Sequence, residues 1–520
     1  MKKRTFILTL LLIFVSISIF QFTLNYMKRI KPPSSTWSKE VLISSGKINT
    51  TPSILKFNDS YLVAHNDNSS IVLLSLDSLG RKNKETSFSA KTALPTRIEL
   101  FTDDKYIYLS WFISDDKSRS LNTIKLDSDL KLIEEYKDSY IKERIKLDDY
   151  LVANSYEDRI EILDLKSKKS TIVKTKFPAA YMSGTKFKDE YIISYMEGSE
   201  GVNYFRLKNG IASDIKLAGV LVEWSRVHYN SSVLSTDGEN AYMLLEYRYL
   251  SDYIAHKLLT FSLNKEEYMV TDYLDKINYG PFSNPVSFKA NNTAKFLISA
   301  GRVYEKKSLY TDILEVTIDG KVASNLVPLS RSRRASMYPA VYNDTAIFCD
   351  FISGDKLNVY MVSSREDFKK VHNEARGSEA MLALTDTFES FVFSMVYILV
   401  YGSLWILPSI CLASLASMFE YKLSDKKRKL LLLFVYFLIV LIKCYFIYSI
   451  SFEKYASLLP ESFTLTLGLA ICIIISIPCS IYAYKKYAED LQHKVVALSI
   501  SLPLIIDSLL TLYVFVPFIK

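Results

Sequence analysis

The chain has 520 residues and a formal net charge of +8 at pH 7. This length exceeds what one hydrophobic core accommodates, so we expect two or three domains. The positive excess is modest and the basic residues are dispersed, which argues against a nucleic-acid-binding protein. Abundant Ile, Lys, Asn, Tyr and Ser is typical of bacteria with low-GC genomes.

The first predicted element is a hydrophobic helix. Residues 6–25, FILTLLLIFVSISIFQFTLN, are long enough to cross a bilayer core of about 30 Å. Two lysines and an arginine precede them, as in a secretory signal peptide, but no convincing small-residue cleavage site follows. We therefore predict an uncleaved signal-anchor helix at residues 1–26, with cleavage as the alternative. A short stiff tether containing Lys-Pro-Pro-Ser-Ser follows at residues 27–36.

Seven units of similar layout occupy most of residues 37–365. In each unit, short apolar or alternating runs are separated by clusters of Asn, Asp, Ser and Gly, a pattern that indicates strands and turns. Their spacing of about 40 to 53 residues matches one four-stranded propeller blade per unit. The units begin at Ser53, Arg97, Glu143, Met182, Ser232, Pro285 and Pro339.

The ends of this region predict how the ring closes. The seventh unit lacks a fourth strand, whereas residues 37–45, WSKEVLISS, form a predicted strand that belongs to no unit. Pairing that strand into the last blade would remove a free sheet edge. We predict an all-β, seven-bladed β-propeller, with six or eight blades or a pair of β-sandwiches as alternatives. The units contain no Trp-Asp dipeptide of WD40 blades and no sialidase-type Asp box, so the resemblance to propellers concerns only the fold.

A helical linker at residues 366–387 and four apolar segments complete the chain. The connectors 419–429 and 484–494 are rich in lysine, whereas the loop 451–462 contains only one. Short basic loops stay in the cytoplasm, so we predict five transmembrane helices with the N-terminus inside and both the propeller and the C-terminus outside. The four predicted C-terminal spans are 388–417, 430–450, 463–483 and 495–518.

Two opposite charges interrupt the apolar segments. Lys443 lies within LIVLIKCYFI, and Asp507 lies at nearly the same depth, each roughly 18 to 20 Å from the cytoplasmic end of its helix. Because isolated charges in hydrocarbon are costly, we predict that they form an intramembrane ion pair. Three roles remain open: a clamp that fixes helix packing, an element of an ion path, or snorkelling of Lys443 to the interface. An ion path would need a series of further acidic residues along the helices, and their lack favours the clamp.

The sharpest charge cluster outside the membrane is SRSRRAS, with Arg331, Arg333 and Arg334. Guanidinium forks suit phosphate and carboxylate groups, so this cluster is a candidate contact for an anion or an acidic partner, with a solvated loop as the alternative.

Motifs for catalysis or metal binding are missing from the sequence. The five histidines and five cysteines show no metal-ligand spacing and no disulfide framework. No phosphate-binding loop, nucleophile elbow or dinucleotide fingerprint occurs. We therefore predict no metal, no cofactor and no catalytic residue.

These features predict a bacterial cell-envelope membrane protein whose extracytoplasmic propeller binds a partner protein or an envelope ligand, as a scaffold, a receptor or an accessory subunit. A component of a membrane transporter is the alternative, and an envelope enzyme with its site on the propeller face is a second one. Besides the lipid bilayer, a lateral membrane partner or a homo-oligomer is expected, because five spans exceed what anchoring requires.

Overall fold

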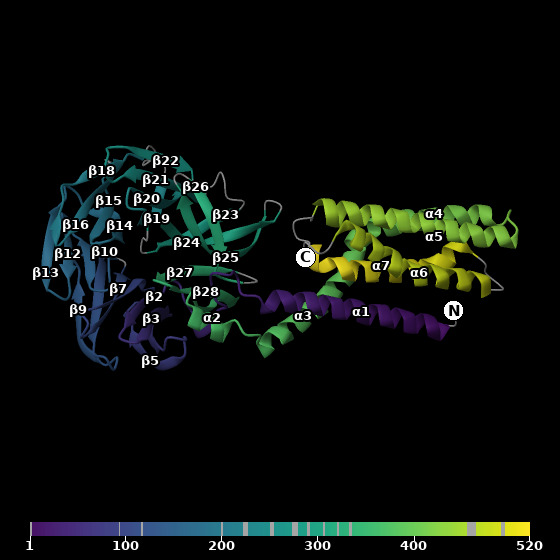
Figure 1. Cartoon of the computed structure of the whole chain (residues 1–520), viewed down its shortest axis with the longest axis horizontal. Helices are drawn as coiled ribbons and strands as arrows, with labels where there is room; N and C mark the ends of the chain where they lie inside the picture. Colours follow the sequence, from purple (N-terminus) through teal and green to yellow (C-terminus); the bar gives the residue numbers. More distant parts are fainter. Residues whose placement is uncertain are drawn as a thin grey trace. The chain divides into compact units, whose positions relative to one another are not determined.

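The computed structural model describes residues 3–92, 94–115, 118–198, 201–221, 227–249, 254–272, 279–288, 292–304, 307–319, 322–331, 335–454, 464–489 and 495–519. Two compact units divide the chain: one is Pro32–Glu374, and the other combines Met1–Lys31 with Ala375–Lys520. Strands make up almost all of the first unit and helices all of the second (Figure 1).

The first unit is a seven-bladed β-propeller, which confirms the predicted fold. The strands of blades 1 to 3 are β2 (Ser53–Phe57), β3 (Ser60–Asp67), β4 (Ser70–Leu76), β5 (Lys82–Ser89); β6 (Thr96–Thr102), β7 (Ile107–Asp115), β8 (Ser118–Leu126), β9 (Leu132–Asp138); β10 (Glu143–Lys146), β11 (Leu151–Ser155), β12 (Arg159–Asp164) and β13 (Lys169–Lys174). Those of blades 4 and 5 are β14 (Ala179–Phe187), β15 (Glu190–Glu197), β16 (Val202–Lys208), β17 (Ile211–Ala212), β18 (Lys216–Gly219); β19 (Val227–Thr236), β20 (Asn240–Tyr249), β21 (Ile254–Ser262) and β22 (Tyr268–Asp272). Those of blades 6 and 7 are β23 (Tyr279–Ser287), β24 (Ala294–Tyr304), β25 (Lys307–Asp319), β26 (Val322–Pro328); β27 (Ser336–Tyr342), β28 (Thr345–Ser353), β29 (Lys356–Ser363) and β1 (Val41–Gly46).

The first strand of each unit lies innermost in its blade. These strands contact their counterparts in neighbouring blades, for example β2 with β6 and with β27, and β14 with β10 and with β19. Both faces of each blade pack against another blade, so middle strands such as β3 are buried along nearly their whole length. Serine hydroxyls join adjacent inner strands, because Ser53 Oγ accepts from Leu100 N at 3.1 Å and Ser183 Oγ accepts from Leu234 N at 2.8 Å.

The last blade takes its outermost strand from the N-terminal end of the unit. β1 pairs antiparallel with β29, with Val41 opposite Met361 and Gly46 opposite Leu357. The sequence predicts a strand over 37–45 in this role, and the strand in the structure begins at Val41. Just before it, Ser38 N donates to Ser363 O at 3.0 Å and Ser363 N donates to Ser38 Oγ at 3.0 Å.

The second unit is a helical bundle. Its elements are α1 (Lys3–Ile30), α3 (Gly377–Tyr397), the π-helical turn η3 (Ile398–Gly402), α4 (Ser403–Glu420), α5 (Asp425–Ile447), the π-helical turn η4 (Tyr448–Lys454), α6 (Leu465–Glu489) and α7 (Val496–Ile519). Five helical stretches among the described residues are long and apolar enough to cross a membrane, which indicates a multi-pass membrane protein. α7 is the most buried of them and contacts α1, α3, α4 and α6.

The structure divides the predicted linker at 366–387 differently. Its first part is the short helix α2 (Glu366–His372), which belongs to the propeller unit. Its second part is the beginning of α3, which continues through η3 into α4 as one stretch of 44 residues. At 1.5 Å per residue such a stretch measures about 66 Å, roughly twice the thickness of a bilayer core. The apolar pattern identified only the part from 388 because the preceding turns carry polar side chains on their buried face.

A buried histidine lies where β1 meets blade 1. His65 Nδ1 lies 2.9 Å from Asn66 O and Nε2 lies 2.8 Å from Ser44 Oγ on β1. The carbonyl oxygen can only accept, so Nδ1 carries the proton and Nε2 accepts from the hydroxyl. Burial lowers the pKa of His65 below its ordinary value, because the charged imidazolium loses its hydration.

We expect the propeller to lose stability in mild acid through this residue. The unfolded chain takes up a proton at His65 near pH 6.5, whereas the folded chain does so only at lower pH. The contribution is therefore fully present above about pH 6.5 and falls below it, by up to about 1.4 kcal/mol per pH unit. Thermal unfolding of the detergent-solubilised protein between about pH 8 and pH 5 measures this. The substitution His65→Gln should flatten the profile, and an unchanged profile would contradict the assignment.

Candidate functional sites

The structure brings Lys443 of α5 and Asp507 of α7 together inside the helical unit. Both side chains are 0% exposed, and Lys443 Nζ lies 2.8 Å from Asp507 Oδ1. The ammonium also lies 2.6 Å from Ser476 Oγ, 3.1 Å from Cys472 O and 3.2 Å from Thr511 Oγ1. An ammonium has three protons, so these oxygens satisfy it fully. The network joins α5, α6 and α7.

Ser476 of α6 is the member of this network that sequence reasoning missed. Its Oγ lies 3.1 Å and 3.0 Å from the two carboxylate oxygens of Asp507, so it contacts both charged partners. It lies 13 residues before Glu489, the end of α6 that the sequence predicts to be cytoplasmic, which is about 20 Å along the helix and close to the depth predicted for the ion pair. Comparing the depths of all polar residues in the apolar segments, and not only of the charged ones, would have found it.

This geometry suits a clamp. The ammonium and the carboxylate are satisfied by each other and by neighbouring oxygens, and the network's hydrogen-bond partners include no further acid or histidine among the described residues. Removal of one charge would leave the other buried and uncompensated, which costs about 3–5 kcal/mol in protein interiors.

The N-terminal helix α1 is also joined to the bundle by polar contacts. Gln21 Nε2 donates to two consecutive backbone carbonyls of α7, each at 2.9 Å. Asn25 Nδ2 donates to Thr387 Oγ1 at 3.1 Å, and Arg29 Nε donates to Asp386 Oδ2 at 3.1 Å. The sequence did not predict the second ion pair, because Arg29 and Asp386 fell in segments assigned to a tether and a linker.

The arginine cluster is described only in part. Arg331 binds Glu40 through both arms of its guanidinium, with Nε 3.0 Å from Oε2 and Nη2 2.7 Å from Oε1. The fork predicted to bind an anion therefore already holds a carboxylate of the same chain. Arg333 and Arg334 lie outside the described residues.

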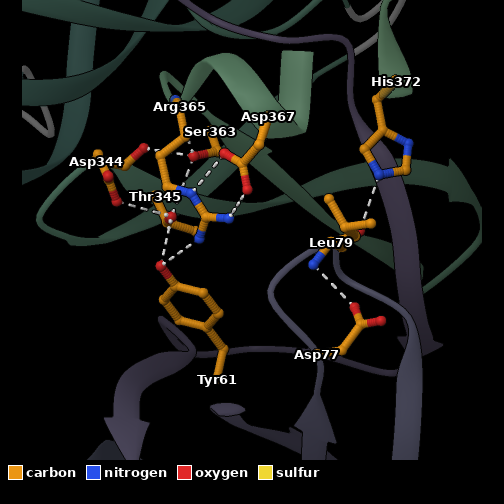
Figure 2. Close-up of polar contacts among 9 residues, drawn as sticks. All are labelled: Tyr61, Asp77, Leu79, Asp344, Thr345, Ser363, Arg365, Asp367 and His372. Carbon is orange, nitrogen blue, oxygen red and sulfur yellow. Dashed lines mark hydrogen bonds and ion pairs between the residues drawn. The ribbon is translucent and has the colours of Figure 1, made fainter. Parts of the chain in front are cut away.

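A polar hollow of about 510 Å³ opens where the turns of blade 7 and blade 1 meet. Figure 2 shows the hydrogen bonds beside it: the Arg365 guanidinium binds Asp367 and donates to Tyr61 Oη at 3.3 Å, and Thr345 Oγ1 lies 3.2 Å from the same phenol oxygen. The lining residues are Lys56, Asp59, Tyr61, Ser78, Tyr342, Asn343, Asp344 and Arg365.

Tyr342, in the wall of this hollow, also bridges the centre of the ring. Its phenol donates to Asp149 Oδ2 at 2.6 Å, and the ammonium of Lys146 lies 5.8 Å from the centre of its ring. Blades 7 and 3 are three positions apart in a ring of seven, so this contact crosses the central channel. Burial and the hydrogen bond to Asp149 raise the pKa of Tyr342, so the phenol stays protonated and keeps donating.

The inner strands carry a repeated irregularity that the sequence did not predict. Arg97, Tyr181, Asn284 and Tyr338 all have left-handed φ values between 51° and 55° and lie at β-bulges of β6, β14, β23 and β27. Such a conformation costs of order 1–3 kcal/mol for a non-glycine residue and persists where surrounding contacts impose it. The only sequence signal is the proline that follows two of them, because proline within a strand marks a bulge.

Charged groups gather next to the first of these bulges. Arg97 forms an ion pair with Glu143 of the neighbouring inner strand. Burial raises the pKa of Glu99 to about 7, partly offset by the nearby cations Arg144 and Arg97. Arg144 itself is buried, and its Nε donates to Asn154 Oδ1 at 2.6 Å. The ion pair of Arg97 with Glu143 joins two neighbouring inner strands and so forms part of the ring's structure.

No protein-family model and no curated protein sequence matches the chain. Solved structures are similar at low identity. The β-propeller domain of the trilobed protease from Pyrococcus furiosus, described with an open velcro topology, aligns over 61% of this chain and 95% of its own, with 12% identity and a TM-score of 0.38. A catalytically inactive virginiamycin B lyase from Staphylococcus aureus with quinupristin aligns over 63% and 99%, with 10% identity and a TM-score of 0.38. Neither similarity transfers an activity to this chain.

We expect single neutralisation of the intramembrane pair to be more damaging than double neutralisation. Lys443→Met or Asp507→Leu alone should destabilise the bundle by about 3–5 kcal/mol, because the remaining charge stays buried without a partner. The double variant should recover most of that loss. Unfolding of the detergent-solubilised protein by sodium dodecyl sulfate measures the difference, with Lys422→Met in the exposed connector as the control. Single variants as stable as the original protein would refute the clamp.

Proposed function

We propose that this protein is a receptor or scaffold of the bacterial cell envelope, in which the propeller lies outside the membrane and binds a partner protein or an envelope ligand. The observation that carries this proposal is the polar hollow at one mouth of the ring. The side chains of Lys56 and Asp59, both exposed in its wall, have no hydrogen-bond or ion-pair partner within the described part of the chain. These two charges are therefore available to a ligand.

The proposed orientation follows from charge in the connectors. Lysine-rich segments at 419–429 and 484–494 would stay in the cytoplasm, with the N-terminus on the same side. The propeller and the C-terminus would then lie outside. α1 would be a permanent member of the bundle, because its polar side chains bond to α3 and α7.

We do not propose transport or catalysis. Lys443 and Asp507 are buried and form hydrogen bonds with neighbouring oxygens, so no contact in the described bundle indicates that they conduct an ion.

Site-specific photocrosslinking in native membranes tests the binding role. A photoreactive amino acid at Asn343 or Ser78, on the rim of the hollow, should give a product of higher mass because a bound molecule lies within reach. The same amino acid at Lys169, on the exposed outer strand β13, serves as the matched control. Mass spectrometry identifies the attached species. Only uncrosslinked monomer at both rim positions would refute the proposed role.

Retention of α1 is a separate prediction. Intact-mass measurement of protein purified from membranes should find the N-terminal helix still attached. Loss of the helix would remove the backbone that holds Arg29 3.1 Å from Asp386 and would leave this buried carboxylate without this ion pair. A mass corresponding to cleavage between residues 26 and 36 would show that α1 is a signal peptide.

A further inference from the structure

We propose that the hollow between blades 7 and 1 binds an uncharged saccharide, such as a short segment of an envelope polysaccharide. This inference rests on the binding role proposed above and adds the site and the chemical class of the ligand. The hollow's volume of about 510 Å³ lies within the range of sites for small ligands, about 300–1,000 Å³. It therefore has room for a short oligosaccharide.

The charges in the hollow argue against an ionic ligand. Its wall holds two cations and two anions, from Lys56, Arg365, Asp59 and Asp344. A polyanion would meet both carboxylates and a polycation would meet both basic groups, and each like-charge contact opposes binding. Asp367 beside the hollow already holds the guanidinium of Arg365, so the wall offers no surplus of positive charge to an anion. Lys56, Asp59 and Asp344 remain as groups that can hydrogen bond with an uncharged ligand.

The remaining wall supplies the groups that hydroxyls need. Carboxylates accept hydrogen bonds, the ammonium donates them, and Asn343 and Ser78 can do both. Tyr342 contributes a half-buried aromatic ring, whose orientation is fixed by the hydrogen bond of its phenol to Asp149. An aromatic ring held in place offers contact area for the apolar face of a sugar with little loss of side-chain entropy.

The hollow adjoins the part of the propeller where both chain connections begin. Tyr61 Oη and Ser363 Oγ both lie 3.2 Å from Thr345 Oγ1, as Figure 2 shows. Ser363 in turn exchanges hydrogen bonds with Ser38 on the segment that leads in from α1. On the segment that leads out to α3, Arg365 lines the hollow itself. A ligand in the hollow would therefore lie close to residues next to both connections.

Titration of the full-length, detergent-solubilised protein with neutral oligosaccharides tests the proposal. The probes are maltotetraose, cellotetraose and chitotetraose, and the charged comparisons are oligogalacturonate and tetralysine. We expect at least one neutral probe to bind and both charged probes to bind at least tenfold more weakly. The double variant Lys56→Ala/Asp59→Asn should weaken the neutral probe's affinity at least tenfold. These two side chains are exposed and unpaired in the described structure, so their loss should leave the melting temperature unchanged.

The matched control removes one charge of each sign from the equivalent turn of blade 4. Lys188→Asn/Asp189→Asn changes exposed residues there, and asparagine tolerates the left-handed conformation of position 188. This variant should bind like the original protein. Failure of every neutral probe to bind, equal binding of a charged probe, or binding unaffected by the blade 1 variant would overturn the saccharide site. Crosslinking of a protein at the rim would still support the binding role, so the two proposals can fail separately.

Discussion

The propeller depends on one pairing, that of β1 with β29. Without it, β29 would present a free edge and the last blade would have three strands. With it, the seven blades form a closed ring. Hydrophobic side chains from adjacent blades then pack together in the clusters between them. The same pairing creates the junction at which His65, Ser38 and Ser363 make their buried hydrogen bonds. The hollow and the two chain connections lie at this junction because the ring closes there.

A comparable constraint acts in the helical unit. Lys443 cannot reach water, so two neighbouring helices place oxygen atoms around it. α7 contributes the carboxylate and a hydroxyl, and α6 contributes a hydroxyl and a carbonyl. α7 also receives the donor from Gln21 of α1, which makes it the centre of the bundle. Polar contacts thus specify which apolar helices are neighbours, a choice that apolar packing alone leaves open.

Repetition and hydropathy made the architecture predictable. Strand and turn signals recur at similar intervals, which predicted seven blades, and the strand near Val41 that belongs to no unit indicated how the ring closes. The depth of Lys443 and Asp507 placed them on one level. The hollow was not predictable, because Lys56 and Arg365 become neighbours only when the ring is closed. The bulges at Arg97 and Tyr181 carry no local sequence signal. The ion pair of Arg331 was not predictable either, because its partner Glu40 is remote in sequence.

The closing pair also sets an order on synthesis. Val41 pairs with Met361, about 320 residues later, so β1 leaves the ribosome long before its partner exists. β1 therefore stays without its partner strand while the seven blades are made. The ring can close only after the seventh blade is complete, when the segments for α3 to α7 are still to come. A chain terminated before that point would keep β1 unpaired and the ring of blades open, with exposed strand edges that favour aggregation.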